Sequence, residues 1–284
     1  MAAVLVGCDF SSSPSRQKPI VLAWGQLRGA VVMLDRLESL TSLTAFEQWL
    51  AQPGSWTGGF DLPFGLPREL LVALGWPLNW EACMRHYASL SRDEIRTAFA
   101  GFCNARPVGG KFAHRLCDVP AGSSPSMKWV NPPVAYMLHA GVPRLLQAGV
   151  ECVGLQERTH VPPAPDADQP KKRALEAYPG VLAREVLGRR SYKSDDRAKQ
   201  TAERLIARKD LLTALETGQT RLGLRLKLTH AQRDALVDDA KGDALDAVLC
   251  LVQVAWGARQ YAGGDPRYGL PADMDPLEGW ILTV

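Results

Sequence analysis

Residues 58–67 read GGFDLPFGLP, and Asp61 is the only charged residue in this segment. The apolar run at 56–60 predicts a buried strand that ends at this acid. The paired glycines allow another backbone to approach the strand closely, and the two prolines turn the chain away after it. Burying an ionised carboxylate without a partner costs several kcal/mol. Asp61 therefore needs either the backbone N–H groups of the turn at 62–65 or a bound cation.

Further acids lie at the edge of, or within, apolar segments. Asp9 ends the run at 4–10, where it could instead cap the turn at 11–15. Glu176 lies inside the run at 173–178, where an ion pair with an arginine is an alternative to catalysis. Each acid taken alone therefore has a structural explanation as well as a functional one.

The segment at 242–259 carries two more acids, Asp243 and Asp246, at the start of a predicted helix. At 100° per residue they project to one side of that helix, and most of its other positions are small or apolar. Two acids at a buried helix end repel each other unless a cation lies between them, although first-turn acids also interact favourably with the helix dipole. Several such carboxylates converging from different elements are typical of a two-metal site for phosphodiester hydrolysis.

The other patterns predict one α/β domain over residues 1–284. Strands are expected at 4–10, 19–25, 30–34, 56–60 and 173–178, with a helix at 44–51. Helical spacing at 68–74, 92–102 and 134–147, separated by loops rich in Gly, Pro and Ser, predicts a mainly helical insertion over 67–170. Helices are then expected at 181–187, 195–215, 231–238 and 242–259. The expected core is a mixed five-stranded sheet in βββαβαβα order.

Composition excludes several classes of protein. The chain has 284 residues, of which 46% are hydrophobic and 22% charged, so it is neither disordered nor fibrous. No run of about 18 apolar residues is present, and the first residues do not resemble a basic secretion leader, so we expect a cytoplasmic protein without a membrane span. The six cysteines form no C-x-x-C pair, which favours buried, reduced thiols over a zinc site.

The charge is unevenly distributed along the chain. Residues 171–233 hold 16 Lys and Arg against 7 Asp and Glu, whereas residues 234–284 hold 3 against 9. A basic stretch followed by an acidic one suits an anionic substrate held over metal-binding carboxylates. Solvated helix faces are the alternative explanation.

Together these segments resemble the RNase H-like superfamily, in particular its RuvC-type resolvase branch with a helical Asp-x-x-Asp. More closely, the chain is similar to an uncharacterised family of predicted RNase H-like nucleases, whose activity is itself inferred from the fold. The segments that carry the resemblance are GCDFSSSP (7–14), GGFDLPFGLP (58–67), HRLCD (114–118), LEAYPG (175–180) with SYKSD (191–195), and GDALDAVLC (242–250).

The resemblance implies an RNase H-like fold and a metal-dependent nuclease acting on DNA or RNA with Mg²⁺ or Mn²⁺, expected as two ions. The superfamily's helical glutamate has no clear match, and we do not assign Glu47 to it. The implied catalytic and metal-binding residues are Asp9, Asp61, Glu176, Asp243 and Asp246. The implied substrate contacts are His114, Arg115, Tyr192 and Lys193.

Two other functions remain open. Actin-like ATPases and phosphotransferases share the same core, but they hold phosphates with glycine-rich hairpins, and the turn at 11–13 is three serines. A nucleic-acid-binding module without catalysis is the second alternative, although concentrated acids would then have little purpose. A metal-dependent nuclease is therefore the main hypothesis.

Overall fold

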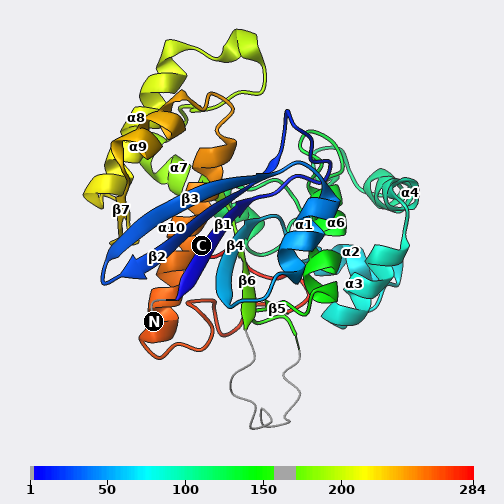
Figure 1. The fold of residues 1–284 in the computed structure, drawn as a ribbon. Coiled ribbons are helices and arrows are strands. Elements are labelled where there is room, and N and C mark those ends of the chain that lie inside the picture. Colours follow the sequence, from blue (N-terminus) through cyan, green and yellow to red (C-terminus); the bar gives the residue numbers. More distant parts are fainter. Residues whose placement is uncertain (1–2, 157–170) are drawn as a thin grey trace.

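The computed structural model describes residues 3–156 and 171–284. Its centre is a seven-stranded mixed sheet in the order β5-β6-β4-β1-β2-β3-β7 (Figure 1). Strand β1 pairs antiparallel with β2 and parallel with β4, β2 pairs antiparallel with β3, and β4 pairs parallel with β6. The strands are β1 (Val4–Asp9), β2 (Ile20–Arg28), β3 (Val31–Leu40), β4 (Trp56–Asp61), β5 (Glu151–Cys152), β6 (Lys172–Ala177) and β7 (Arg225–Lys227).

Each of the five longer strands overlaps a predicted strand, so the α/β class is confirmed, although β3 continues to Leu40, well beyond its predicted end at 34. The predicted total of five is wrong, because β5 and β7 add an edge strand on each side of the sheet. These two strands have two and three residues, which is too short to produce a recognisable alternating pattern.

The part of the chain that the structure describes contains ten α-helices. Helices α2, α3, α4 and α6 gather on one side of the sheet, and α7, α8 and α9 lie toward the other (Figure 1). The helices are α1 (Leu43–Ala51), α2 (Arg68–Leu74), α3 (Trp80–Ser89), α4 (Arg92–Asn104), α5 (Asp118–Ala121), α6 (Val134–Gln147), α7 (Pro179–Leu187), α8 (Ala202–Thr217), α9 (His230–Asp238) and α10 (Asp243–Ala262).

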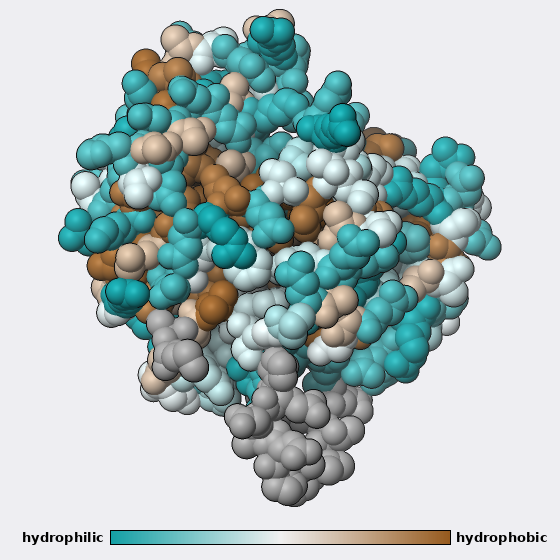
Figure 2. Space-filling model, viewed as in Figure 1, coloured by the Kyte–Doolittle hydropathy of each residue, from teal (hydrophilic) through white to brown (hydrophobic). Residues whose placement is uncertain are grey.

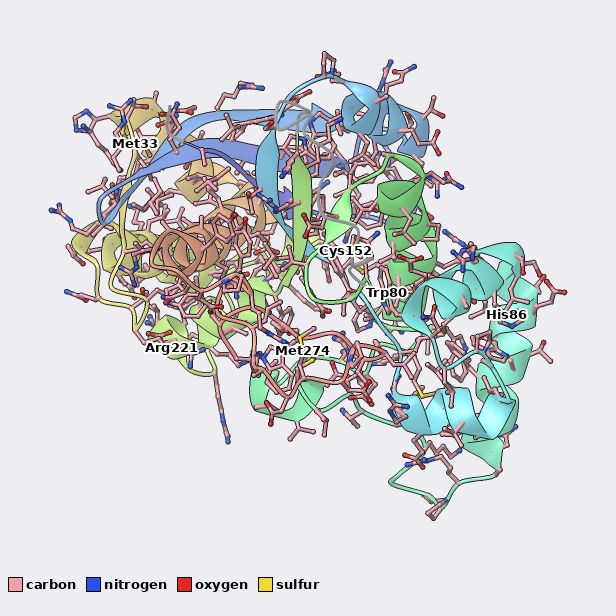
Figure 3. All side chains as sticks on the ribbon, turned by 90° about the horizontal axis from the view of Figure 1, so that it is seen from below. Met33, Trp80, His86, Cys152, Arg221 and Met274 are labelled. Carbon is pink, nitrogen blue, oxygen red and sulfur yellow. The ribbon has the colours of Figure 1, made fainter. Side chains whose placement is uncertain are left out.

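Helices α2 to α6 lie between β4 and β6 in the chain. The end of the predicted insertion, residues 157–170, lies outside the described residues. Helix α3, which was not predicted, begins after Asn79, whose side chain accepts a hydrogen bond from the Ala82 amide at 3.0 Å. In the view from below, Trp80 and His86 of this helix lie well apart from Met33 of β3 (Figure 3).

The predicted helix at 195–215 begins too early. Helix α8 starts at Ala202, and the residues before it form a loop with a single 3₁₀ turn at Arg197–Lys199. Asp196 caps this turn by accepting a hydrogen bond from the Ala198 amide at 3.0 Å. Short polar side chains that bond to nearby backbone in this way favour turns over helix interiors.

Helix α10 lies unusually close to one face of the sheet. A Cβ atom at Gly7 of β1 would lie 2.0 Å from the carbonyl oxygen of Ala247, and one at Gly59 of β4 would lie 2.8 Å from that of Cys250. These contacts are backbone to backbone, so only glycine fits at either position. The predicted close approach at the glycine pair thus occurs at Gly59, whereas Gly58 faces the side chains of Trp56 and Phe60.

The opposite face of the sheet packs against α1 through aromatic side chains. Trp49 of α1 stacks on Trp56 at 5.2 Å between ring centroids, and Phe46 meets Phe10 edge to face at 5.3 Å. All six cysteines lie among the described residues and are buried and free. No helix in residues 3–156 and 171–284 combines the length and the apolar character of a membrane span. The surface seen in Figure 2 is largely hydrophilic, with hydrophobic residues in small groups.

We expect Gly7→Ala to lower the free energy of unfolding by about 3 kcal/mol or more, because the added methyl group must displace α10. Urea denaturation followed by circular dichroism measures this. Gly101→Ala in α4 is the matched control, since no atom lies within 4 Å of the added carbon, and alanine should leave stability equal or slightly higher. Equal stability of the two variants would contradict the packing described here.

Candidate metal centre

The register of two parallel strands brings Asp9 and Asp61 together. Asp9 of β1 lies directly beside Asp61 of β4 at the carboxyl ends of both strands. Side chains alternate between the faces of a sheet, so these acids lie on the same face as Gly7 and Gly59. That is the face covered by α10.

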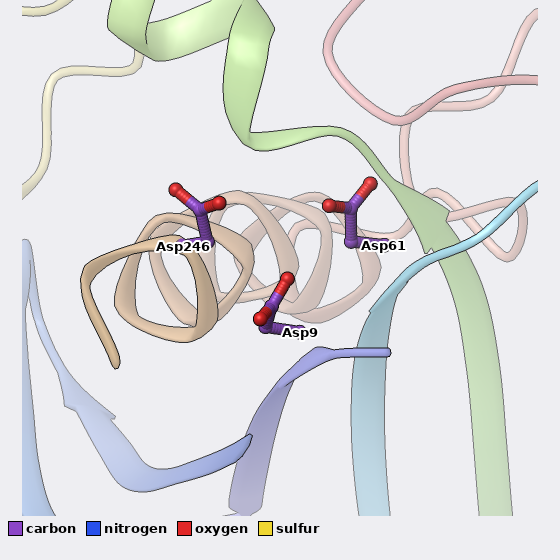
Figure 4. Close-up of side chains that lie close together, drawn as sticks. All are labelled: Asp9, Asp61 and Asp246. Carbon is purple, nitrogen blue, oxygen red and sulfur yellow. The ribbon is translucent and has the colours of Figure 1, made fainter. Parts of the chain in front are cut away.

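Helix α10 provides the third acid. Asp246 is fully buried and lies close to Asp9 and Asp61 at the two strand ends (Figure 4). One carboxylate oxygen from each of Asp9, Asp61 and Asp246 lies within 4.8 Å of the others. The three acids therefore converge from two strands and one helix, and we call them the acidic cluster.

Asp246 is held by a neighbouring loop. The Tyr192 hydroxyl donates to its Oδ1 at 2.5 Å, and the Lys193 ammonium forms an ion pair with its Oδ2. The buried guanidinium of Arg208 fixes this loop by donating to the carbonyl oxygens of Tyr192 at 2.7 Å and Val237 at 2.6 Å. Burial and the Asp246 charge raise the pKa of Tyr192 well above its ordinary value, so its hydroxyl remains a donor.

The electrostatics of the acidic cluster favour a positive ligand. Burial raises the pKa of Asp61 to about 7, the negative charge of Asp246 adds to this increase, and Lys193 opposes it. Burial and Asp246 also raise the pKa of Asp9 well above its ordinary value. The cluster must therefore take up protons or bind a cation near neutral pH.

The structure does not place Glu176 in the acidic cluster, although the sequence predicted it there. In the pairing of β6 with β4, Glu176 lies beside Phe60, and Ala177 lies beside Asp61. A difference of one residue puts its side chain on the opposite face. There its two oxygens accept hydrogen bonds from Arg115 at 2.6 and 2.7 Å and from the Phe64 amide at 2.9 Å.

Arg115, predicted to contact substrate, is the structural partner in this pair. It is 2% exposed and also donates to Asp118 and to the Glu278 carbonyl oxygen. Burial raises the pKa of Glu176 and Arg115 opposes this, so the two groups stabilise each other's charged form. His114, the neighbouring prediction, is exposed and lies outside the residues that line the cleft described below.

Asp243 is close to the acidic cluster but is not a member of it. It lies in the first turn of α10, is partly exposed, and lines a cleft together with Asp9 and Asp61. Burial and the nearby Asp239 raise its pKa. Of the nine residues predicted for the site, the structure thus brings together Asp9, Asp61, Asp246, Tyr192 and Lys193, with Asp243 at the border. Glu176 and Arg115 also line this cleft, but they are paired with each other and are not members of the acidic cluster.

The cleft has a volume of about 600 Å³. Its wall includes Lys18, Arg92 and Tyr136, none of which the sequence analysis selected. Arg92 and Tyr136 come from the helical insertion, and only folding brings α4 and α6 to the end of β1, so no local pattern identifies them.

The donor set suits a hard divalent cation. Mg²⁺ and Mn²⁺ prefer carboxylate oxygens, and each member of the acidic cluster offers at least one. Comparisons of the chain with protein-family models, with curated proteins and with solved structures found no match.

We expect the metal-free protein to lose stability as pH rises from 4 to 7, because the buried Asp61 carboxyl loses its proton over this range. Its pKa is higher in the folded state than in the unfolded chain, so its stabilising protonation is complete below pH 4 and is lost through about pH 7. Urea unfolding in EDTA measures the free energy of unfolding at pH 5 and at pH 8. Between these pH values the wild type should lose roughly 2 kcal/mol more than Asp61→Asn, whose side chain cannot ionise. Asp234→Asn, at an exposed site on α9, should behave as the wild type, and an identical pH slope in Asp61→Asn would contradict the prediction.

Glu176→Gln should separate structural from metal-binding acids. Breaking a buried ion pair costs about 3–5 kcal/mol, so we expect a large fall in melting temperature. The rise in melting temperature caused by Mn²⁺ should nevertheless persist in this variant, because Glu176 lies on the other face of the sheet. Differential scanning fluorimetry measures both quantities, and a folded variant that no longer responds to Mn²⁺ would return Glu176 to the metal site.

Proposed function

We propose that the protein is a metal-dependent nuclease that hydrolyses phosphodiester bonds of nucleic acid at the acidic cluster. The observation that carries this proposal is the convergence of three carboxylates, one of them fully buried, from three separate elements within 4.8 Å. Such a cluster is costly for the folded state unless a cation compensates it. Its position in a cleft of about 600 Å³ leaves room for a substrate beside it.

The proposal includes an RNase H-like core. The order of the five longer strands, β6-β4-β1-β2-β3, with β2 antiparallel to its neighbours, supports this assignment. The two short edge strands and the insertion between β4 and β6 would be additions to that core. The positions of Asp9 and Asp61 at adjacent strand ends, with Asp246 on a helix across that face, fit the acidic pattern implied by the sequence motifs.

Bound Mg²⁺ or Mn²⁺ would activate water and stabilise the leaving oxygen of the phosphodiester. Asp9, Asp61 and Asp246 would hold the cations, and Asp243, one turn earlier on α10 and in the same cleft, is the acid best placed to add oxygen ligands for a second ion. Lys193 lines the cleft on the substrate side of Asp246, where its ammonium would attract and orient the phosphate.

The alternative of an actin-like ATPase has less support. The connection between β1 and β2 lines the cleft with Ser11, Ser12 and Ser13 and with Lys18, but it lacks the glycine-rich hairpin that holds nucleotide phosphates. Including ATP among the substrates tested distinguishes this function from nuclease activity.

With Mg²⁺ or Mn²⁺, we expect the purified protein to cleave DNA or RNA oligonucleotides and to leave ATP intact. Asp9→Asn should reduce the rate by roughly a hundredfold or more while its circular dichroism spectrum remains that of the wild type. Asp234→Asn on α9 is the matched control and should cleave at the wild-type rate. Cleavage that continues undiminished in Asp9→Asn would refute the proposal.

A further inference from the structure

The acidic cluster lies between two cavities of different chemical character. The larger cavity is the cleft of about 600 Å³, and a second cavity of about 220 Å³ shares Asp61, Tyr178 and Lys193 with it. The two cavities therefore meet at the cluster. A polymer whose reacting bond lies at the acidic cluster would extend into both cavities.

Away from the acids, much of the wall of the larger cavity is apolar. A volume of about 600 Å³ lies within the range that binds small organic ligands, roughly 300–1,000 Å³. An apolar wall of this size suits a flat, poorly hydrated group better than a phosphate. Its apolar lining includes Phe10, Leu62, Pro133, Val134, Met137 and Ile281.

Two flat polar side chains complete this wall. The Arg92 guanidinium lies 4.9 Å from the ring centroid of Tyr136. Its Nη2 donates to the Ser12 carbonyl oxygen at 2.8 Å, and the Tyr136 hydroxyl donates to the Arg92 carbonyl oxygen at 3.3 Å. Aromatic rings and guanidinium planes held in place are the groups on which unpaired nucleobases stack.

The second cavity carries three basic side chains beside Asp61 and Asp246 of the acidic cluster. Arg184, Arg190 and Lys193 line it, and a third cavity of about 410 Å³ continues from Arg190 and Ser191. Lys199 and Arg204 line that third cavity together with the acid Glu203. Arg190 is half-exposed and paired with Asp210 at 2.7 Å, so it can reach a phosphate at low cost. This side of the acidic cluster suits a sugar-phosphate backbone.

We infer that the substrate is single-stranded nucleic acid, with one unpaired base in the apolar cavity and the backbone beyond the reacting phosphate running over the basic cavities. The inference rests on the proposed nuclease function and adds the substrate class. A base inside a duplex is stacked and paired, so it cannot enter this cavity unless it is first extruded. The protein would therefore select strands, loops or branch points with unpaired bases.

Binding of fluorescein-labelled 12-nucleotide strands tests this by fluorescence anisotropy, with Ca²⁺ replacing Mg²⁺ so that binding is measured apart from cleavage. We expect the single strand to bind at least tenfold more tightly than the same sequence in a blunt duplex. Replacing single nucleotides by abasic sites should weaken binding about tenfold at one position and little elsewhere. This scan needs no protein variant, so it cannot fail through misfolding.

Protein variants assign the two sides of the cleft. Tyr136→Ala should weaken single-strand binding about tenfold, Tyr136→Phe should retain it, and Tyr261→Ala, at the exposed far end of α10, is the matched control. Arg190→Ala should weaken binding to every sequence. It should also reduce the slope of the logarithm of the binding constant against the logarithm of salt concentration by about the amount that one phosphate contact contributes.

Equal binding of duplex and single strand together with a flat abasic scan would overturn the inference, even if the protein cleaves duplex as a nuclease. A position-specific abasic effect without any cleavage in Mg²⁺ or Mn²⁺ would support the base-binding cavity and refute the nuclease function instead. The two proposals therefore fail separately.

Discussion

The contact between α10 and the sheet is the constraint on which the site depends. Gly7 and Gly59 let the helix backbone approach β1 and β4 more closely than any side chain would permit. Parallel pairing places Asp9 and Asp61 side by side at the strand ends, and the short distance to α10 brings Asp246 opposite them. The packing of the core and the geometry of the acidic cluster are thus one arrangement, because moving the helix away from the strands would separate the three carboxylates.

This arrangement has an electrostatic cost. Three acids in a half-buried site repel one another, and the positive and donor groups of the neighbouring loop act mainly on Asp246, through Tyr192 and Lys193. The pKa of Asp61 therefore remains raised, to about 7. Functional sites commonly retain such unfavourable charge because a ligand compensates it. The second buried acid system, Glu176 with Arg115, is different: both Glu176 oxygens accept hydrogen bonds from a buried guanidinium, and the pair joins β6 to the insertion and to the C-terminal segment near Glu278.

Local sequence patterns predict most of the elements but not all of the site. Alternating apolar residues located the five longer strands. Helical periodicity predicted α2 and α6 with the limits that the structure shows. Asp9, Asp61 and Asp246 were selected because acids beside apolar runs need a physical explanation, and their convergence follows from the register of β1 with β4 and the close packing of α10. Glu176 was grouped with the metal-binding acids because the register of β6 against β4 cannot be read from composition, and one residue decides the face. Arg92 and Tyr136 were missed because long-range folding alone brings the insertion to the cleft.

Anomalous scattering from crystals grown or soaked with Mn²⁺ would show whether the acidic cluster binds a cation. We expect an anomalous peak between Asp9, Asp61 and Asp246, about 2.1 Å from an oxygen of each, and no such peak in crystals of Asp61→Asn. A manganese peak found only at other acids would contradict metal binding by the acidic cluster. So would crystals at millimolar Mn²⁺ in which Lys193 stays paired with Asp246 and the cluster binds no ion.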